Sequence, residues 1–241
     1  MSQLLRSSTV MAALGIVTVL SLVSCAQAPP TQEPPLPAAA KASPTPPAGD
    51  HTLFEINEPE SLLLIKVMRS GPLSRFGHNH IIGGPVIGGR VWLAEKLADS
   101  RVELTIRLLD MQVDEPQWRL EAGEDFTSVP SDEDIAGTRA NMMSPKVLDT
   151  DNFPVATAEV SGILGAAPDF SVLARITLKG NTRSLPIPVH FERQENRFVA
   201  TGTFGLTQSD FAIEPFSVLL GAISVQDEVQ VQYTIVASAS P

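Results

Sequence analysis

The sequence predicts a mostly β protein: an antiparallel barrel of about eight strands with one short helix. First, apolar residues beyond about position 51 recur at every second position, which is typical of half-buried strands. Second, turn signals such as Gly180-Asn181 separate these runs. Third, Cys25 is the only cysteine, so no disulfide can support the sheet, and closing it into a barrel removes its exposed edges. An open β-sandwich is the alternative architecture.

The first element, residues 1–24, is predicted to be an export signal. Arg6 precedes an apolar run from Val10 to Val23, and small residues lead up to Cys25. The run is shorter than the roughly 20 apolar residues that span a bilayer. Because it ends in Leu-Val-Ser-Cys, it resembles a bacterial lipoprotein signal, which implies cleavage before Cys25 and acyl chains on that residue. An ordinary signal peptide with a chance cysteine, or a signal anchor, is the alternative.

The second element, residues 25–50, is predicted to be a tether between the lipidated cysteine and the folded domain. Residues 26–50 contain eight prolines among Ala, Ser and Thr, a composition that cannot bury a core and favours extended polyproline II. Ala26 directly after the cysteine, rather than Asp, favours sorting to the outer membrane, facing the periplasm, in a host with two membranes. The protein is therefore expected in the bacterial envelope, with the membrane as a partner through the acyl chains.

Residues 51–241 are predicted to form one domain, because no second linker and no internal repeat interrupt them. The chain carries 27 acidic and 17 basic residues, a net charge of −10, without a basic cluster. Phosphate binding needs a concentrated Lys/Arg face, so a nucleic-acid partner is not expected.

The first clear strand of this domain is 102–108, where apolar and polar residues alternate. A helix follows at 131–143. Ser131 is a plausible N-cap, the acidic run from Asp132 to Asp134 suits the positive end of a helix, and Pro145 lies just beyond its end. We therefore interpret these adjacent acids as capping charges rather than as catalytic carboxylates.

Four further runs of alternating residues follow the helix. In the second of them, Pro186 and Pro188 share one face, which favours an edge strand or an irregular strand. The four runs are residues 170–178, 185–191, 198–206 and 229–235.

Several short motifs, in order along the chain, resemble the YceI-like, polyisoprenoid-binding domain family. These are Ser-Pro-Lys-Val-Leu-Asp at 144–149, Asn-Phe-Pro-Val-Ala at 152–156, and the segments 178–183, 204–211 and 227–229. The resemblance covers about Leu53 to Ala237. It implies a secreted or periplasmic protein with a lipocalin-like, eight-stranded antiparallel β-barrel that holds a long isoprenoid chain. Two segments depart from the family: 72–89 is richer in Gly and His, and 111–131 is longer than a tight connection.

An isoprenoid or other long-chain lipid inside the barrel is therefore the expected partner, and sequestration or carriage the expected role. Eight strands enclose just enough space for side chains or one small ligand, so a filled, purely structural barrel remains the alternative. The candidate lipid-binding residues, assigned to the inward face by hydrophobicity alone, are Leu104, Ile106, Ile176, Phe204, Leu206, Phe211, Val231 and Tyr233.

A histidine pair supports a competing hypothesis from another class. His78 and His80 would share one face of a strand and could chelate a metal, although a third ligand is normally needed. Hydrogen bonding at a barrel mouth is the simpler interpretation. No nucleophile elbow and no free thiol are present, and the Gly83–Gly89 run lacks the Lys-Ser or Lys-Thr of a phosphate loop. Neither an enzyme nor a cofactor is expected.

Overall fold

The computed structural model describes residues 49–240. The predicted signal, Cys25 and almost all of the predicted tether lie outside the described residues. No helix among those described is long and apolar enough to cross a membrane.

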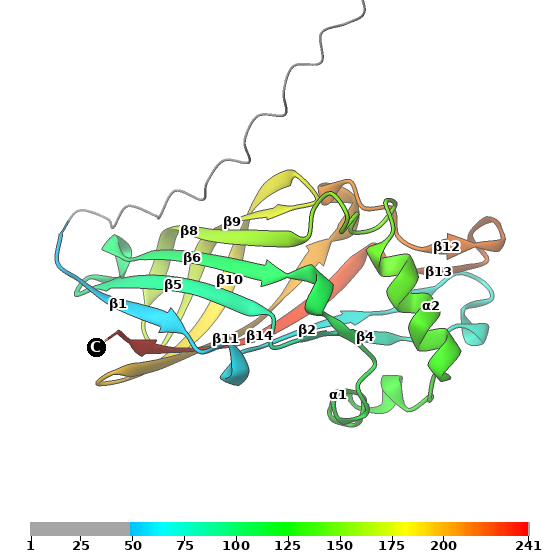
Figure 1. Cartoon of the computed structure of the whole chain (residues 1–241), viewed down its shortest axis with the longest axis horizontal. Coiled ribbons are helices and arrows are strands. Elements are labelled where there is room, and N and C mark those ends of the chain that lie inside the picture. The colour runs from blue at the N-terminus through cyan, green and yellow to red at the C-terminus, as the bar shows by residue number, and fades with distance from the viewer. Residues whose placement is uncertain (1–48, 241) are drawn as a thin grey trace, which may run out of the picture. The chain divides into compact units, whose positions relative to one another are not determined.

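Eight antiparallel strands form a closed barrel, so the predicted fold class is confirmed (Figure 1). Pairing of the first strand with the last closes the ring, and Phe54 lies opposite Ala239 at this seam. In sheet order the eight strands are β1 (His51–Ile56), β5 (Ile87–Ala94), β6 (Arg101–Arg107), β8 (Val155–Ala166), β9 (Asp169–Leu178), β10 (Asn181–Gln194), β11 (Arg197–Thr207) and β14 (Glu228–Ala239).

The last strand, β14, is shared between two neighbours. Near its C-terminal end it pairs with β1, and nearer its N-terminal end with β2 (Leu62–Val67). β2 pairs in turn with β4 (His80–Gly84), which pairs with β7 (Gln112–Val113). This three-strand extension continues the barrel wall toward the helical end of the domain (Figure 1).

Two α-helices flank the barrel, one more than the sequence predicted. α2 (Asp132–Met143) is the expected helix, and its N-terminus is a capping box in which the Ser131 hydroxyl accepts from the Asp134 amide. α1 (Pro116–Ala122) lies inside the long connection 111–131. With seven residues, about two turns, it is too short to produce a recognisable 3.6-residue pattern, and Pro116 at its start is its main local signal.

Short 3-10 helices occupy many of the connections. They are η1 (Glu58–Glu60), η2 (Ser74–Phe76), η3 (Leu97–Asp99), η4 (Leu108–Asp110), η5 (Glu124–Phe126), η6 (Gln208–Phe211) and η7 (Leu219–Gly221). A second, three-stranded sheet lies apart from the barrel sheet and consists of β12 (Ser217–Val218), β13 (Ile223–Val225) and β3 (Arg69–Ser70).

The two prolines of β10 coincide with a break in the barrel ladder. β10 pairs with β9 from Asn181 to His190, but with β11 only from His190 to Gln194. Proline has no N–H to donate, so it cannot complete a ladder on both sides. The expectation of an edge or irregular strand is confirmed at the two prolines, because this part of β10 pairs with β9 alone and only its C-terminal part also pairs with β11.

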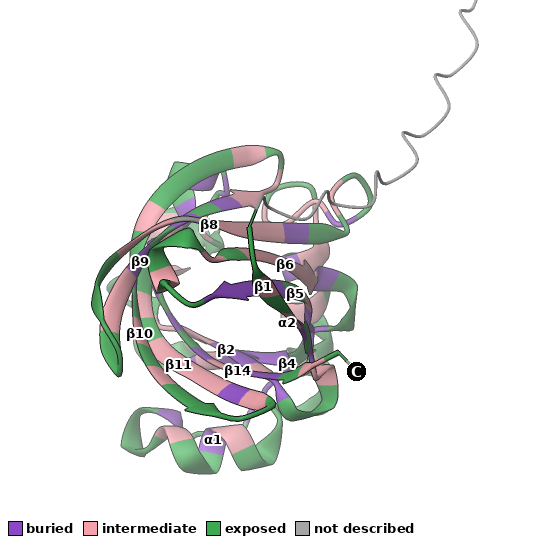
Figure 2. Ribbon diagram, turned by 90° about the vertical axis from the view of Figure 1, so that its left-hand side faces the viewer, coloured by how far each residue is buried: buried purple, intermediate pink, exposed green. Residues whose placement is uncertain are grey.

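The core lies inside the ring, where the apolar faces of the strands meet. Figure 2 shows the strands curving around this interior, with exposed residues on the outer surface. The largest fully buried side chains, at about 0% exposure, are those of Phe54 and Phe211. Phe54 packs at 5.1 Å between ring centroids against Phe198, which joins β1 to β11 at one end of the barrel.

Candidate functional site

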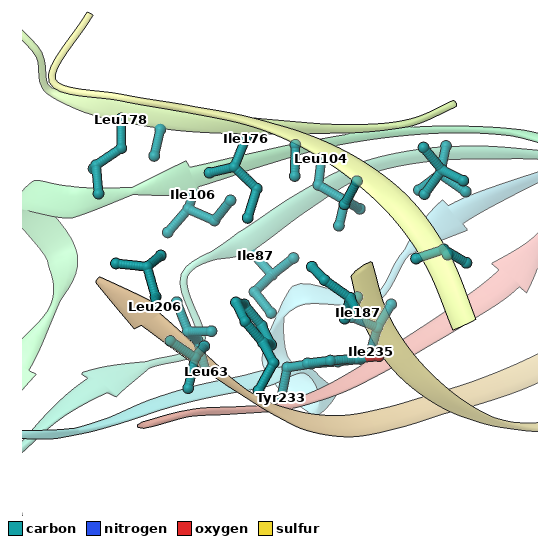
Figure 3. Close-up of a pocket in the computed structure, with 18 of the residues that line it drawn as sticks. Leu63, Ile87, Leu104, Ile106, Ile176, Leu178, Ile187, Leu206, Tyr233 and Ile235 are labelled. Atoms are coloured by element: carbon teal, nitrogen blue, oxygen red, sulfur yellow. The ribbon is translucent and has the colours of Figure 1, made fainter. Parts of the chain in front are cut away.

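The barrel encloses an apolar cavity of about 300 Å³. Every barrel strand except β1 contributes to its wall, together with β2 and the segment around α2, where Met142, Val147 and Leu148 line it. Figure 3 shows branched apolar side chains from several strands converging on this space. The volume lies at the lower end of the range of about 300–1,000 Å³ for small-molecule sites, so the interior is hollow rather than filled.

Strand alternation explains why the wall is apolar. On β6, Leu104 and Ile106 line the cavity, while Glu103 and Thr105 between them belong to the outward face. The same period places Ala174 and Ile176 of β9 inward. The neighbouring strands repeat this pattern, so the alternating runs of the sequence become one continuous hydrocarbon surface.

Only three of the lining residues carry a polar side-chain atom: Ser100, Gln208 and Tyr233. Each already has a protein partner. Ser100 Oγ accepts from the Ala94 amide at 3.0 Å, and the Gln208 side-chain nitrogen donates to the Gln226 carbonyl at 2.8 Å. Among the described residues, no charged side chain lines the cavity.

The Tyr233 hydroxyl donates to the Pro188 carbonyl at 2.7 Å. Burial raises the pKa of this phenol, so it remains neutral and protonated. The wall therefore offers no charge and few unused polar groups to a ligand. Apolar contact is the main interaction that it can make.

Seven of the eight candidate residues from the sequence line the cavity, and Phe211 does not. Phe211 was assigned to the inward face by hydrophobicity, but it lies beyond the strand, which ends at Thr207, and belongs to η6. The Phe211 side chain is instead fully buried in the surrounding core. The seven lining residues are Leu104, Ile106, Ile176, Phe204, Leu206, Val231 and Tyr233.

Sequence reasoning missed the contributions of β2 and β5 to the wall. On β2, Leu63 and Ile65 face the cavity, but Leu64 on the opposite face is also buried, under Phe126 and its neighbours. Because both faces are covered, residues 62–65 form a continuous apolar run without alternation. On β5, likewise, Trp92 between the lining residues Val91 and Leu93 is buried, so this part of the strand is also an apolar run without alternation.

The histidine pair lies outside the cavity, between β4 and the helical segments. The rings of His78 and His80 are 6.3 Å apart, and His80 Nδ1 bonds Asp114 Oδ2 at 2.6 Å. His78 Nε2 is 3.9 Å from Asp134 Oδ2. Across the described residues, no three His, Cys, Asp or Glu side chains are grouped so that they could hold a metal ion.

Asp114 is the centre of a buried polar network beside this pair. Burial alone would raise the pKa of the Asp114 carboxyl. The pKa nevertheless lies below its ordinary value, because the carboxylate accepts hydrogen bonds from His80, the Ile81 amide and Arg119, and because the charge of His80 favours it. Arg119 also donates to the carbonyls of Asn79 and Phe126 at 2.8 and 3.0 Å. The network fixes α1 and its flanking loop against β4, which is a structural role.

Comparisons with known proteins agree with this architecture. The family model described as the YceI-like domain matches residues 76–237. The crystal structure of Burkholderia cenocepacia BcnA superposes with a TM-score of 0.57 at 17% identity, over 76% of this chain and 99% of that one. A polyisoprenoid binding domain from Saccharophagus degradans, implicated in plant cell wall breakdown, gives 0.53 at 14% identity, over 78% and 98%. No curated protein matches this chain in sequence.

Proposed function

The chain belongs to the family of YceI-like domains, and from that premise we propose that its barrel binds the apolar chain of an isoprenoid-type or similar long-chain lipid. The observation that carries the proposal is the hollow, uncharged cavity. A hydrocarbon chain gains about 0.8 kcal/mol for each CH₂ removed from water, and it needs no polar partner along its length. A charged or strongly polar ligand would leave its groups unpaired against this wall.

The solved polyisoprenoid binding domain of S. degradans supports the same ligand class, since it shares the fold. The hollow interior also weighs against a purely structural barrel. A large apolar void forfeits packing contacts around its whole lining, so an occupant is the simplest way to restore them.

We further propose that acyl chains on Cys25 anchor the protein in the bacterial envelope, on the outer membrane and facing the periplasm. The Leu-Val-Ser-Cys ending of the apolar segment and the proline-rich residues after it support this. Two or more acyl chains hold a protein firmly in a bilayer, whereas one chain holds it marginally. Mass spectrometry of the parent chain is expected to show acyl chains on Cys25, and a Cys25→Ser chain is expected to lose that mass. If the parent chain carries no acyl mass, the anchor is wrong.

Native mass spectrometry of the protein, extracted gently from cells, tests the lipid-binding proposal. An additional mass in the range of quinones or polyprenols is expected. Ala158 lines the cavity and Thr157 beside it does not, so they form a matched pair. Ala158→Trp should remove the bound mass by filling the cavity, while Thr157→Trp should keep it. A bare protein mass that stays unchanged after incubation with polyprenol lipids would reject the proposal.

A further inference from the structure

A cluster of exposed apolar side chains lies on the small sheet β12-β13-β3 and the loop that follows β3. We call this region, residues 69–77 and 215–226, the distal tip. Figure 1 shows β12 and β13 at the end of the barrel domain, beyond α2. Leu220 is fully exposed, Leu219 is 66% exposed and Phe76 is 63% exposed. The other exposed apolar residues of the tip are Leu73, Phe216 and Val218.

The two leucines are held outward by an unfavourable backbone conformation. Leu219 has φ 51° and Leu220 has φ 55°, both in the left-handed region that residues with a Cβ avoid. A glycine or asparagine would adopt this turn more easily, so leucine here is poorly explained by folding alone. An exposed, strained leucine pair points to a contact with something outside the chain.

The two segments of the tip form one body. β13 pairs with β3, and the hydroxyls of Ser70 and Ser224 are 2.8 Å apart. The Leu73 amide donates to the Ala222 carbonyl at 2.8 Å. The apolar side chains therefore form one preformed surface rather than two independent loops.

The charge of the tip differs from that of the whole chain. Overall the protein has 27 acidic and 17 basic residues, yet the tip contains Arg69 and Arg75 and no Asp or Glu. The Arg75 guanidinium lies over the Phe76 ring, 4.7 Å from its centroid. An apolar ring and a cation therefore lie side by side. Side chains at a membrane interface have the same arrangement, with the apolar part among the acyl chains and the cation near the phosphate headgroups.

The tip is continuous with one end of the cavity. Val67 and Ile213 line the cavity and lie two positions before the first residues of the two tip segments. Gln208, also in the wall, donates to the Gln226 carbonyl, and the Gln226 amide donates to the Met68 carbonyl at 2.7 Å.

We propose that the distal tip inserts into the surface of an anionic phospholipid bilayer. Leu219, Leu220 and Phe76 enter the acyl boundary, and Arg69 and Arg75 meet the headgroup phosphates. A bilayer fits better than a second copy of this acidic chain, because the charged side chains within the tip are cations, and its apolar and cationic groups match the apolar interior and the anionic headgroups of a bilayer. This docking would bring the adjoining end of the cavity to the membrane.

A tryptophan placed at the tip of the full-length chain tests the insertion. Leu220→Trp is compared with Leu120→Trp on α1, where the parent leucine is 78% exposed. Both chains are reconstituted into vesicles of phosphatidylethanolamine and phosphatidylglycerol that contain brominated lipid. Both share the same N-terminal segment, so any difference reports on the tip. Insertion to about 5–10 Å should shift the added emission to shorter wavelength and quench it about twofold more in Leu220→Trp.

A second substitution tests the charge argument. Arg75→Glu in the Leu220→Trp chain should reduce the quenching toward that of Leu120→Trp, because it sets an acid against the headgroups. Equal quenching of the two tryptophan variants would overturn the proposal. A shift to shorter wavelength that appears without vesicles and grows with protein concentration would also overturn it, in favour of self-association. None of these outcomes depends on whether the cavity holds a lipid.

Discussion

At the scale of single residues, Tyr233 connects β14 to the part of β10 that has no hydrogen-bond ladder to β11. Its ring extends from β14 past Gly202 of β11, and its hydroxyl donates to the Pro188 carbonyl of β10. A Cβ at Gly202 would come within 2.6 Å of the Tyr233 hydroxyl and 2.2 Å of that carbonyl. Glycine is therefore required here by close approach. The tyrosine satisfies a carbonyl in the part of β10 that has no ladder to β11.

Tyr233→Phe should lower the free energy of unfolding by about 1 kcal/mol, because the hydrogen bond to the Pro188 carbonyl is lost while the ring still fills its space. Urea denaturation followed by circular dichroism measures the change. Gly202→Ala serves as the comparison and should cost about 1–3 kcal/mol through overpacking. If Tyr233→Phe is as stable as the parent, this hydrogen bond is not what holds β10 in place.

Asp114→Asn should lower the free energy of unfolding by about 3–5 kcal/mol at neutral pH, because it leaves the buried Arg119 charge unpaired. The pKa of Asp114 is lower in the folded protein than in the unfolded chain. Its contribution is therefore complete above about pH 4 and is lost as pH falls through the lower, folded pKa. The difference in the free energy of unfolding between the parent and Asp114→Asn should therefore become smaller as the pH falls through that range.

Urea unfolding of both chains between neutral pH and about pH 3 measures this narrowing, since the range spans the ordinary Asp pKa. Asp132→Asn is the control. Asp132 is an exposed acid in the first turn of α2, so its substitution should change stability by about 1 kcal/mol or less. If the difference in the free energy of unfolding between the parent and Asp114→Asn stays constant down to the lowest pH, the role given to Asp114 is wrong.

At the scale of elements, local signals predicted those structures whose cause is itself local. α2 was predictable because Ser131, its acidic first turn and Pro145 act within a few residues of the helix ends. The alternating runs were predictable because one face of each strand meets the cavity and the other meets solvent. β2 was not, because the packing of Phe126 over Leu64 buries its outer face, and that contact joins residues far apart in sequence.

Ser131→Ala should lower the free energy of unfolding by about 1 kcal/mol, since the Asp134 amide loses its acceptor in the capping box. Ser131→Gly should cost only a few tenths of a kcal/mol, because glycine leaves that amide open to water. Thermal unfolding of the two variants measures the difference. Equal losses would mean that the cap is not what fixes the start of α2.

At the scale of the whole molecule, the closed barrel could be predicted from the sequence, whereas the size of the cavity inside it could not. The volume of the cavity depends on how far apart eight strands hold their inward side chains, which is a sum over non-local contacts. Ala156, Ala158 and Ala174 on adjacent strands, all in the wall, show this. Each is an ordinary residue in its own run. Across β8 and β9, Ala158 lies opposite Ile176 and Ala174 opposite Val160, so the space left inside depends on which side chains the register brings together.

Bound lipid should therefore stabilise the fold in a way that depends on this space. A ligand at about 100 times its dissociation constant adds about 2.7 kcal/mol, which raises the Tm of a domain of this size by about 5–10 °C. We expect that rise when polyprenol is added to the delipidated parent and to Thr157→Trp. Ala158→Trp should not respond, because its side chain occupies the site. A similar rise in the Tm of Ala158→Trp would mean that the ligand binds outside the barrel. If polyprenol does not raise the Tm of the parent, the cavity does not bind this lipid.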